Sequence, residues 1–234
     1  MDTFNFNQTD GMSISLDVST VMKRVYLKMF AALLITAATA YGIALIVPQF
    51  LVTLAENSWI YWGCAIAELI LVIAIGRAAF KMSSTTATLL FYLFAILNGV
   101  TFSLILAVYT QASIFKTFLI TAGVYGAMSA YGYFTSRDLS KIGTFLYMAL
   151  FGLIICIVVN LFMKSSTFEW IISGIGVLIF IGITAWDTQK IKRMAEVTPI
   201  EQVNHIATIG ALTLYLDFIN LFIYLLRFFG AGRD

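Results

Sequence analysis

The sequence contains seven long apolar stretches of about 20 residues each, separated by short polar segments. A membrane-spanning helix needs about 20 mostly apolar residues, because the hydrocarbon core of a bilayer is about 30 Å thick and each helical residue rises about 1.5 Å. The stretches are about twice as long as a barrel strand and do not alternate in polarity. We therefore expect an all-α integral membrane protein with seven transmembrane helices, over residues 25–47, 59–80, 87–109, 114–134, 143–163, 169–187 and 206–229.

The composition leaves little room for a soluble domain. The chain is 61% hydrophobic and 11% charged, whereas about 25% of the residues of a soluble domain are charged. Residues 1–22 are polar and are expected to form a flexible cytoplasmic tail, and residues 23–234 are expected to form a single transmembrane domain. The net charge of +2 is too small to suggest a nucleic-acid partner. The expected partner is the lipid bilayer.

The basic residues predict how the chain is oriented in the membrane. With seven spans, ten of the 14 Lys and Arg residues fall on one side and four on the other. The positive-inside rule then puts the amino terminus in the cytoplasm and the carboxyl terminus outside. A six-span arrangement with a re-entrant last segment is the structural alternative. The ten are Lys23, Arg24, Lys28, Arg77, Lys81, Arg137, Lys141, Lys190, Lys192 and Arg193, and the four are Lys116, Lys164, Arg227 and Arg233.

The last span carries a polar stripe on an otherwise apolar helix. Thr213, Asp217, Asn220 and Tyr224 are spaced by four, three and four residues, so they share one narrow helical face. An ionised carboxylate at mid-span costs about 2.5–3.5 kcal/mol on insertion scales, so such residues are functional candidates by default. The alternative is a set of hydrogen bonds that only join helices, which suits Thr213 and Asn220 better than Asp217. We therefore expect the stripe to face the bundle interior or a pore.

Asp187, at the end of the sixth apolar stretch, is the second acidic candidate. Taken alone, it is equally consistent with an interfacial residue beside Trp186 and Lys190. If it meets Asp217, the two carboxylates cannot both ionise cheaply, and we expect them to share a proton and to respond to cytoplasmic pH. Once deprotonated, the pair could also bind Ca²⁺, which prefers oxygen ligands. The expected depths of the two residues in the membrane argue against contact between them, because Asp217 lies roughly 16 Å into its span and Asp187 lies near the membrane edge.

Other polar groups inside the spans have more ordinary interpretations. Glu68 and Asn98 are further intramembrane polar residues, whereas Arg77 and Lys81 share a face at a helix end, where long basic side chains reach for the interface. The glycine pairs Gly123/Gly126 and Gly174/Gly176 are expected to mark close helix packing rather than a site.

Several enzyme chemistries are excluded or disfavoured by the sequence motifs that are missing. The single histidine rules out a His-Glu-x-x-His zinc protease, and neither a Gly-x-Ser-x-Gly elbow nor a phosphate loop is present. An intramembrane aspartyl protease could use Asp187 and Asp217 as its dyad. Asp217 lacks the Gly-x-Gly-Asp context of those proteases, so we expect that the protein is not an enzyme.

Three segments of the chain carry a family resemblance. The strongest is Leu-Tyr-Leu-Asp-Phe-Ile-Asn-Leu-Phe-Ile-Tyr-Leu-Leu-Arg at 214–227. The others are Asp-Thr-Gln-Lys-Ile at 187–191 and Arg-Asp-Leu-Ser at 137–140. These segments resemble the Bax inhibitor-1 (transmembrane Bax inhibitor motif) family, and its bacterial branch above all. The resemblance implies six helices around a central seventh and a location in the bacterial inner membrane.

The resemblance also implies a function, which is a pH-sensitive calcium leak. The gate and pH sensor would be an aspartate pair that falls on Asp187 and Asp217, with Ca²⁺ as the transported ion, no cofactor, and a basic latch at Arg77 or Lys81. Relatives also modulate cell death or inhibit a membrane-bound quality-control protease. The alternative is therefore a non-conducting regulator that binds membrane partners.

Overall fold

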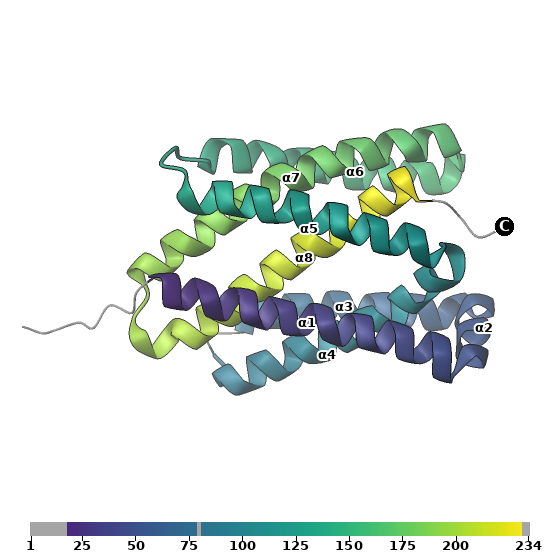
Figure 1. Ribbon diagram of the computed structural model, residues 1–234, viewed down its shortest axis with the longest axis horizontal. Coiled ribbons are helices and arrows are strands. Elements are labelled where there is room, and N and C mark those ends of the chain that lie inside the picture. The colour runs from purple at the N-terminus through teal and green to yellow at the C-terminus, as the bar shows by residue number, and fades with distance from the viewer. Residues whose placement is uncertain (1–17, 79–80, 231–234) are drawn as a thin grey trace, which may run out of the picture.

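The computed structural model describes residues 18–78 and 81–230, and this part of the chain is all-helical. In Figure 1 most of the long helices run roughly lengthwise, and the last helix, in yellow, crosses the bundle diagonally. The predicted tail up to residue 17, residues 79–80 of the predicted second span, and residues 231–234 lie outside the described residues. The elements are α1 (Val18–Ile46), α2 (Pro48–Glu56), α3 (Ser58–Ala78), α4 (Ser84–Val108), α5 (Gln111–Phe134), α6 (Ser140–Met163), α7 (Ser166–Val197), the 3₁₀ turn η1 (Ile200–Gln202) and α8 (Val203–Phe229).

Each predicted span corresponds to one long helix, with three differences. The first helix begins at Val18, inside the predicted tail. A short helix, α2, follows α1, with Pro48 in its first turn, where a missing backbone N–H costs nothing. The third difference bears on the site: α7 continues to Val197, ten residues past the predicted end of the sixth span at 187. Asp187 therefore lies within a helix rather than at its end.

Within residues 18–78 and 81–230, five segments are long and apolar enough to cross a membrane: α1, α4, α6, α7, and η1 together with α8. Outward-facing side chains on these helices are large and apolar, such as Phe30, Phe151 and Phe162, whose exposed fractions are 60%, 68% and 84%. A soluble protein rarely exposes so much contiguous apolar surface. These features fit a multi-pass membrane protein.

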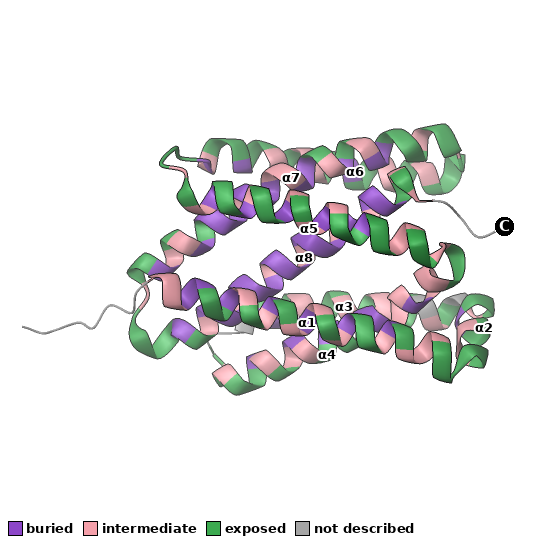
Figure 2. Ribbon diagram, viewed as in Figure 1, coloured by how far each residue is buried: buried purple, intermediate pink, exposed green. Residues whose placement is uncertain are grey.

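The last helix forms the centre of the bundle. In the most apolar 18-residue segment of η1 and α8, 72% is buried inside the protein. The corresponding share for α6 is 11%. Figure 2 shows α8 coloured as buried over most of its length, while the outer helices are exposed on their outward faces. It packs against α1, α4, α5 and α7, and more lightly against α3, whereas α6 packs against α7. The central last helix that the resemblance implied is thus observed.

Close approach of helices occurs at some glycines and not at others. Packing is confirmed at Gly176, where an added Cβ would lie 2.6 Å from the ring of Tyr224 on α8. The same expectation is wrong for Gly123 and Gly126, where an added Cβ would meet nothing within 4 Å. The tight position on α5 is instead Gly132, where a Cβ would lie 2.1 Å from the carbonyl oxygen of Ala185 on α7.

This contrast predicts opposite effects of alanine at two positions of one helix. Gly132→Ala must push α5 away from the α7 backbone, and we expect it to lower the free energy of unfolding by about 1–3 kcal/mol. Gly126→Ala fills open space and improves helix propensity, so we expect no loss and a gain of up to about 1 kcal/mol. Thermal unfolding of the two purified variants in detergent measures the difference, and equal midpoints would contradict the packing described here.

Candidate functional site

Asp187 and Asp217 lie in the interior of the protein on neighbouring helices. The Asp187 side chain on α7 is 1% exposed and that of Asp217 on α8 is 5% exposed. The two helices pack against one another, and the two carboxylates are within electrostatic range of each other. The sequence predicted different membrane depths for the two aspartates. In the structure α7 extends past Asp187 and α8 begins at Val203, so both residues lie inside packed helices. The structure therefore brings the predicted pair together.

The pair is poorly supplied with hydrogen-bond partners. The hydroxyl of Tyr147 on α6 donates to Asp187 Oδ2 over 3.3 Å. Asp187 Oδ1 and Asp217 Oδ2 are buried and accept no hydrogen bond from any residue in the described ranges 18–78 and 81–230. Buried carboxylate oxygens normally have partners, and an unpaired one is costly. Each of the two side chains therefore keeps one buried oxygen without a hydrogen-bond partner among these residues.

Tyrosine and other hydroxyl groups surround the carboxylates. Tyr125 on α5 donates to the carbonyl oxygen of Leu214 over 3.2 Å, and it interacts electrostatically with both aspartates. On the amino-terminal side of α1, Tyr26 Oη lies 2.5 Å from Ser129 Oγ, which lies 3.1 Å from Thr188 Oγ1. The sequence did not lead us to predict these residues as part of the site. A hydroxyl side chain within an apolar span, as at Tyr147, is the feature that could have identified them.

The predicted latch residues do not contact the pair. Arg77 and Lys81 are exposed near the α3–α4 connection, and the described residues contain no ion pair between either of them and an aspartate. The basic group within electrostatic range of both aspartates is Lys190, whose Nζ lies 5.1 Å from the centre of the Trp186 ring. The latch at Arg77 or Lys81 stays a prediction.

Two of the three remaining residues of the stripe on α8 have a described partner: Tyr224 on a neighbouring helix and Asn220 in its own backbone. Tyr224 is buried and stacks on Phe180 of α7, with ring centres 5.7 Å apart. Asn220 is half-buried and donates to the carbonyl oxygen of Leu216 in its own helix. Thr213 is half-buried. A pore-facing role for these three residues stays a prediction.

A second polar cluster lies on the opposite face of α8. Tyr215 donates to Asn98 Oδ1 over 3.0 Å, and Asn98 Nδ2 donates to Glu68 Oε2 over 3.2 Å. Thr101 donates to the other oxygen of Glu68, and Thr36 Oγ1 lies 2.6 Å from the Tyr215 hydroxyl. The sequence predicted Glu68 and Asn98 as further intramembrane polar residues, and here they belong to one network across α1, α3, α4 and α8.

This second cluster opens into a cavity at the carboxyl-terminal end of α8. The cavity has a volume of about 430 Å³, and its lining includes Glu68, Asn98, Thr101 and Arg227. Arg227 lies ten residues after Asp217, or roughly 15 Å further along the helix. Polar groups therefore occur both at the middle of the central helix and at its carboxyl-terminal end.

The amino-terminal half of α8 is held by a half-buried lysine, Lys28, which the sequence predicted only as a marker of membrane orientation. Lys28 on α1 donates to Thr208 Oγ1 of α8 over 2.7 Å and to Thr88 Oγ1 of α4 over 2.9 Å. Arg24 adds a hydrogen bond of 2.9 Å to Asn204 Oδ1. These hydrogen bonds join α1, α4 and α8 between the amino-terminal end of α8 and Asp217.

Two of the three segments that carry the family resemblance are bonded together. Gln189 accepts from the Leu139 backbone N–H over 2.9 Å and donates to the Arg137 carbonyl over 2.8 Å. Arg193 forms a salt bridge of 2.8 Å with Asp138. The loop after α5 therefore holds the part of α7 that follows Asp187.

The exposed carboxylate in this loop gives a pH-dependent prediction. Hydrogen bonds from Ser140, and then from Arg193, lower the pKa of Asp138 from its ordinary 3.8 to about 2. A lowered folded-state pKa means that the stabilisation is present above pH 3.8 and is lost as the pH falls toward about 2. We expect the wild-type protein to lose a little thermal stability in that pH interval. The Asp138→Asn variant should lose less, because asparagine does not ionise. Identical pH profiles for the variant and the wild-type protein would contradict the contact.

Comparison with known proteins identifies the family. The family model described as inhibitor of apoptosis-promoting Bax1 matches residues 18–234. The chain belongs to the Bax inhibitor-1 family. The chain is 45% identical over 221 residues to inner membrane protein YbhL of Escherichia coli. The match covers 92% of this chain and 93% of the relative. An uncharacterized protein of Borreliella burgdorferi is 48% identical over 181 residues, covering 76% of this chain and 78% of the relative. Another from Deinococcus radiodurans is 39% identical over 225 residues, covering 93% and 92%.

Proposed function

We propose that this member of the Bax inhibitor-1 family is a calcium leak channel of the bacterial inner membrane, gated by a proton on the Asp187–Asp217 pair. It is not an enzyme under this proposal, and Ca²⁺ is its transported ion. The observation that carries the proposal is the burial of two carboxylates, each with one unpaired oxygen, on helices that pack together.

The electrostatic reasoning begins with the cost of charge at this depth. One ionised carboxylate in a span costs about 2.5–3.5 kcal/mol, and a second beside it adds repulsion. A single proton shared between Asp187 and Asp217 removes one charge and satisfies the oxygens that lack partners. Gain or loss of that proton changes the attraction between α7 and α8. Proton binding then shifts an equilibrium between two helix arrangements.

The same oxygens suit a passing calcium ion. Ca²⁺ takes six to eight oxygen ligands in its stable sites. The described residues contain no group of three or more His, Cys, Asp or Glu side chains that could hold a metal. Two carboxylates with neighbouring hydroxyls would bind the ion weakly, as a conduction path requires. The polar cavity beside Glu68 supports a continuation of the path toward the carboxyl-terminal end of α8.

Seven spans and a cytoplasmic amino terminus are part of the proposal. α3 has 21 residues and α5 has 24, so each is long enough, at about 1.5 Å per residue, to cross a hydrocarbon core of about 30 Å. Together with the five more apolar spans they make seven. The excess of basic residues at the end where α1 begins supports the orientation.

Calcium flux into liposomes that contain only the purified protein tests the proposal. We expect dye-reported flux above that of protein-free liposomes, with a rate that differs between about pH 6 and about pH 8. Absence of flux at every pH would overturn the channel, and would leave a non-conducting regulator of a membrane protease or another membrane partner as the alternative.

A further inference from the structure

A seam runs between α1 and α5 along one side of the molecule. α1 packs mainly against α4 and α8, and α5 packs against α7 and α8, so the two helices flank α8 from different sides. Figure 1 shows α1 and α5 separated, with α8 crossing behind them. Two cavities lie between α1 and α5 at successive levels of this seam.

The cavity nearer the amino terminus of α1 has a cationic mouth. Its volume is about 530 Å³, and its lining includes Lys23, Tyr26, Ser129 and Tyr133, with apolar residues and Gly126 deeper in. Lys23 is exposed. A second cation lies beside the mouth, because Lys192 Nζ donates to the carbonyl oxygen of Tyr133 over 2.9 Å and sits 5.0 Å from the centre of its ring.

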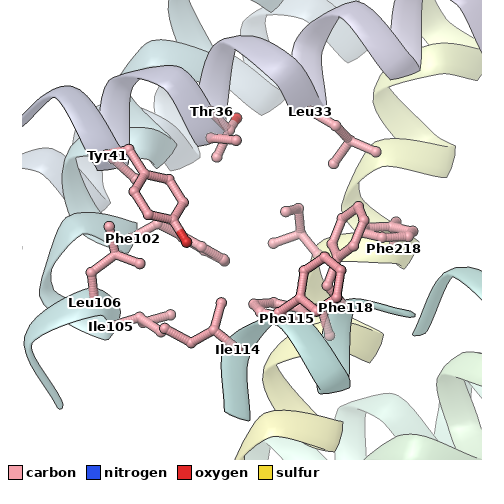
Figure 3. Close-up of a pocket in the computed structure, with 14 residues that line it drawn as sticks. Leu33, Thr36, Tyr41, Phe102, Ile105, Leu106, Ile114, Phe115, Phe118 and Phe218 are labelled. Atoms are coloured by element: carbon pink, nitrogen blue, oxygen red, sulfur yellow. The ribbon is translucent and has the colours of Figure 1, made fainter. Parts of the chain in front are cut away.

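The second cavity is apolar and lies deeper in the bundle. Its volume is about 270 Å³, and Figure 3 shows Leu33, Phe115, Phe118 and Phe218 around the hollow. These residues belong to α1, α5 and α8. At this level the surroundings of a membrane protein are lipid chains, so an apolar opening here is filled by hydrocarbon rather than by water.

The distance between the two cavities matches one lipid chain. Lys23 and Leu33 are ten residues apart on α1, which is roughly 15 Å at helical rise. The hydrocarbon of one leaflet is half of about 30 Å. A chain that starts at the level of Lys23 therefore ends at the level of Leu33, in the second cavity.

We propose that the α1–α5 seam binds an anionic phospholipid from the leaflet that faces the amino-terminal end of α1. The headgroup phosphate pairs with Lys23, beside Lys192, and one acyl chain follows the seam past Gly126 to Leu33. A free phosphate ion would match only the mouth, whereas a phospholipid matches both the cationic mouth and the apolar depth. The inference is independent of ion conduction, so binding and calcium flux can succeed or fail separately.

Photolabelling in a bilayer tests the site. The full-length protein is placed in phosphatidylcholine liposomes that contain phosphatidylglycerol with a diazirine at the end of one acyl chain. After illumination, we expect adducts concentrated on Leu33 and Phe118. Phe145 and Phe151 on α6 are the comparison, because their exposed fractions are 65% and 68% on the outside of the bundle. Equal labelling of α6 and the seam would overturn the proposal.

Paired variants separate the seam from general lipid contact. An added Cβ meets nothing within 4 Å at either Gly126 or Gly123, and both residues are exposed on α5, but only Gly126 lines the cavity. We expect Gly126→Leu to reduce labelling of Leu33 about tenfold, and Gly123→Leu to leave it unchanged. Ala130→Phe fills the same cavity and serves as a second blocking variant. Equal effects at 123 and 126 would overturn the proposal.

The charge at the mouth is tested by competition between headgroups. Unlabelled phosphatidylglycerol should compete better than phosphatidylcholine, and Lys23→Gln should reduce this preference about fivefold, as expected for one basic residue near the membrane surface. Lys116→Gln, at the other end of α5, should not change it. An unchanged preference in Lys23→Gln overturns the headgroup assignment, and protein dimers whose seam is unlabelled would show that a second copy occupies it.

Discussion

A protein carrying both Asp187→Asn and Asp217→Asn is expected to leak calcium at a single rate from about pH 6 to about pH 8. Asparagine approximates the shape of a protonated aspartate and cannot ionise, so the pair stays neutral throughout. In the wild-type protein, a gate that titrates one proton changes its open-to-closed ratio by at most about tenfold per pH unit. The measurement is dye-reported flux into liposomes at matched protein content.

A matched substitution outside the bundle separates the gate from general charge effects. Asp138→Asn removes a carboxylate from an exposed loop, where it pairs with Arg193. We expect it to keep the wild-type pH response of flux. If the double variant and Asp138→Asn respond to pH alike, the gate lies elsewhere.

Substitution of Asn98 by leucine is expected to lower the free energy of unfolding by about 1–3 kcal/mol. Its amide donates to Glu68 and its oxygen accepts from Tyr215, so leucine leaves a half-buried carboxylate and a fully buried hydroxyl with fewer partners. The range allows for the modest value of hydrogen bonds in membranes, where measured pairs average about 0.6 kcal/mol.

Asn220→Leu is the matched control on the central helix. Its amide donates only within α8, to the carbonyl oxygen of Leu216. We expect a loss below about 1 kcal/mol, because no hydrogen bond between helices is broken. Unfolding in mixed micelles with rising dodecyl sulfate compares the two variants. Equal losses would mean that the network from Glu68 to Tyr215 does not stabilise the bundle.

The helices were predictable because their lengths are imposed by the membrane. Apolar runs of about 20 residues are typical of spanning helices, and each predicted run is matched by one long helix, five of them apolar enough in the described residues to cross a membrane. The continuation of α7 from Thr188 to Val197 was not predictable from hydropathy, since that segment is polar. It is held by contacts between distant segments: Gln189 binds the backbone at Leu139, and Lys192 binds the carbonyl of Tyr133.

The site was predictable in its acidic residues and not in their surroundings. A carboxylate such as Asp217 within an apolar helix is recognisable from its cost in lipid. Its neighbours Tyr147 and Tyr125 look like ordinary aromatic residues in the sequence, and only the packing of α5 and α6 around α7 and α8 brings their hydroxyls near the pair. The pairing of Glu68 with Asn98 likewise depends on which faces of α3 and α4 meet.

Glycine spacing gave a mixed result for the same reason. Gly176 does face a large ring, but Gly126 borders an opening and Gly132, which no pattern singled out, touches the α7 backbone. Small residues permit close approach, and the tertiary arrangement decides where it occurs.

Infrared spectroscopy of protein labelled with ¹³C at the aspartate carboxyl carbon tests most directly whether Asp187 and Asp217 share a proton. We expect a protonated-carboxyl band near neutral pH that changes between about pH 6 and about pH 8 and is absent from the double asparagine variant. Only ionised aspartate throughout that range in the wild-type protein would contradict it.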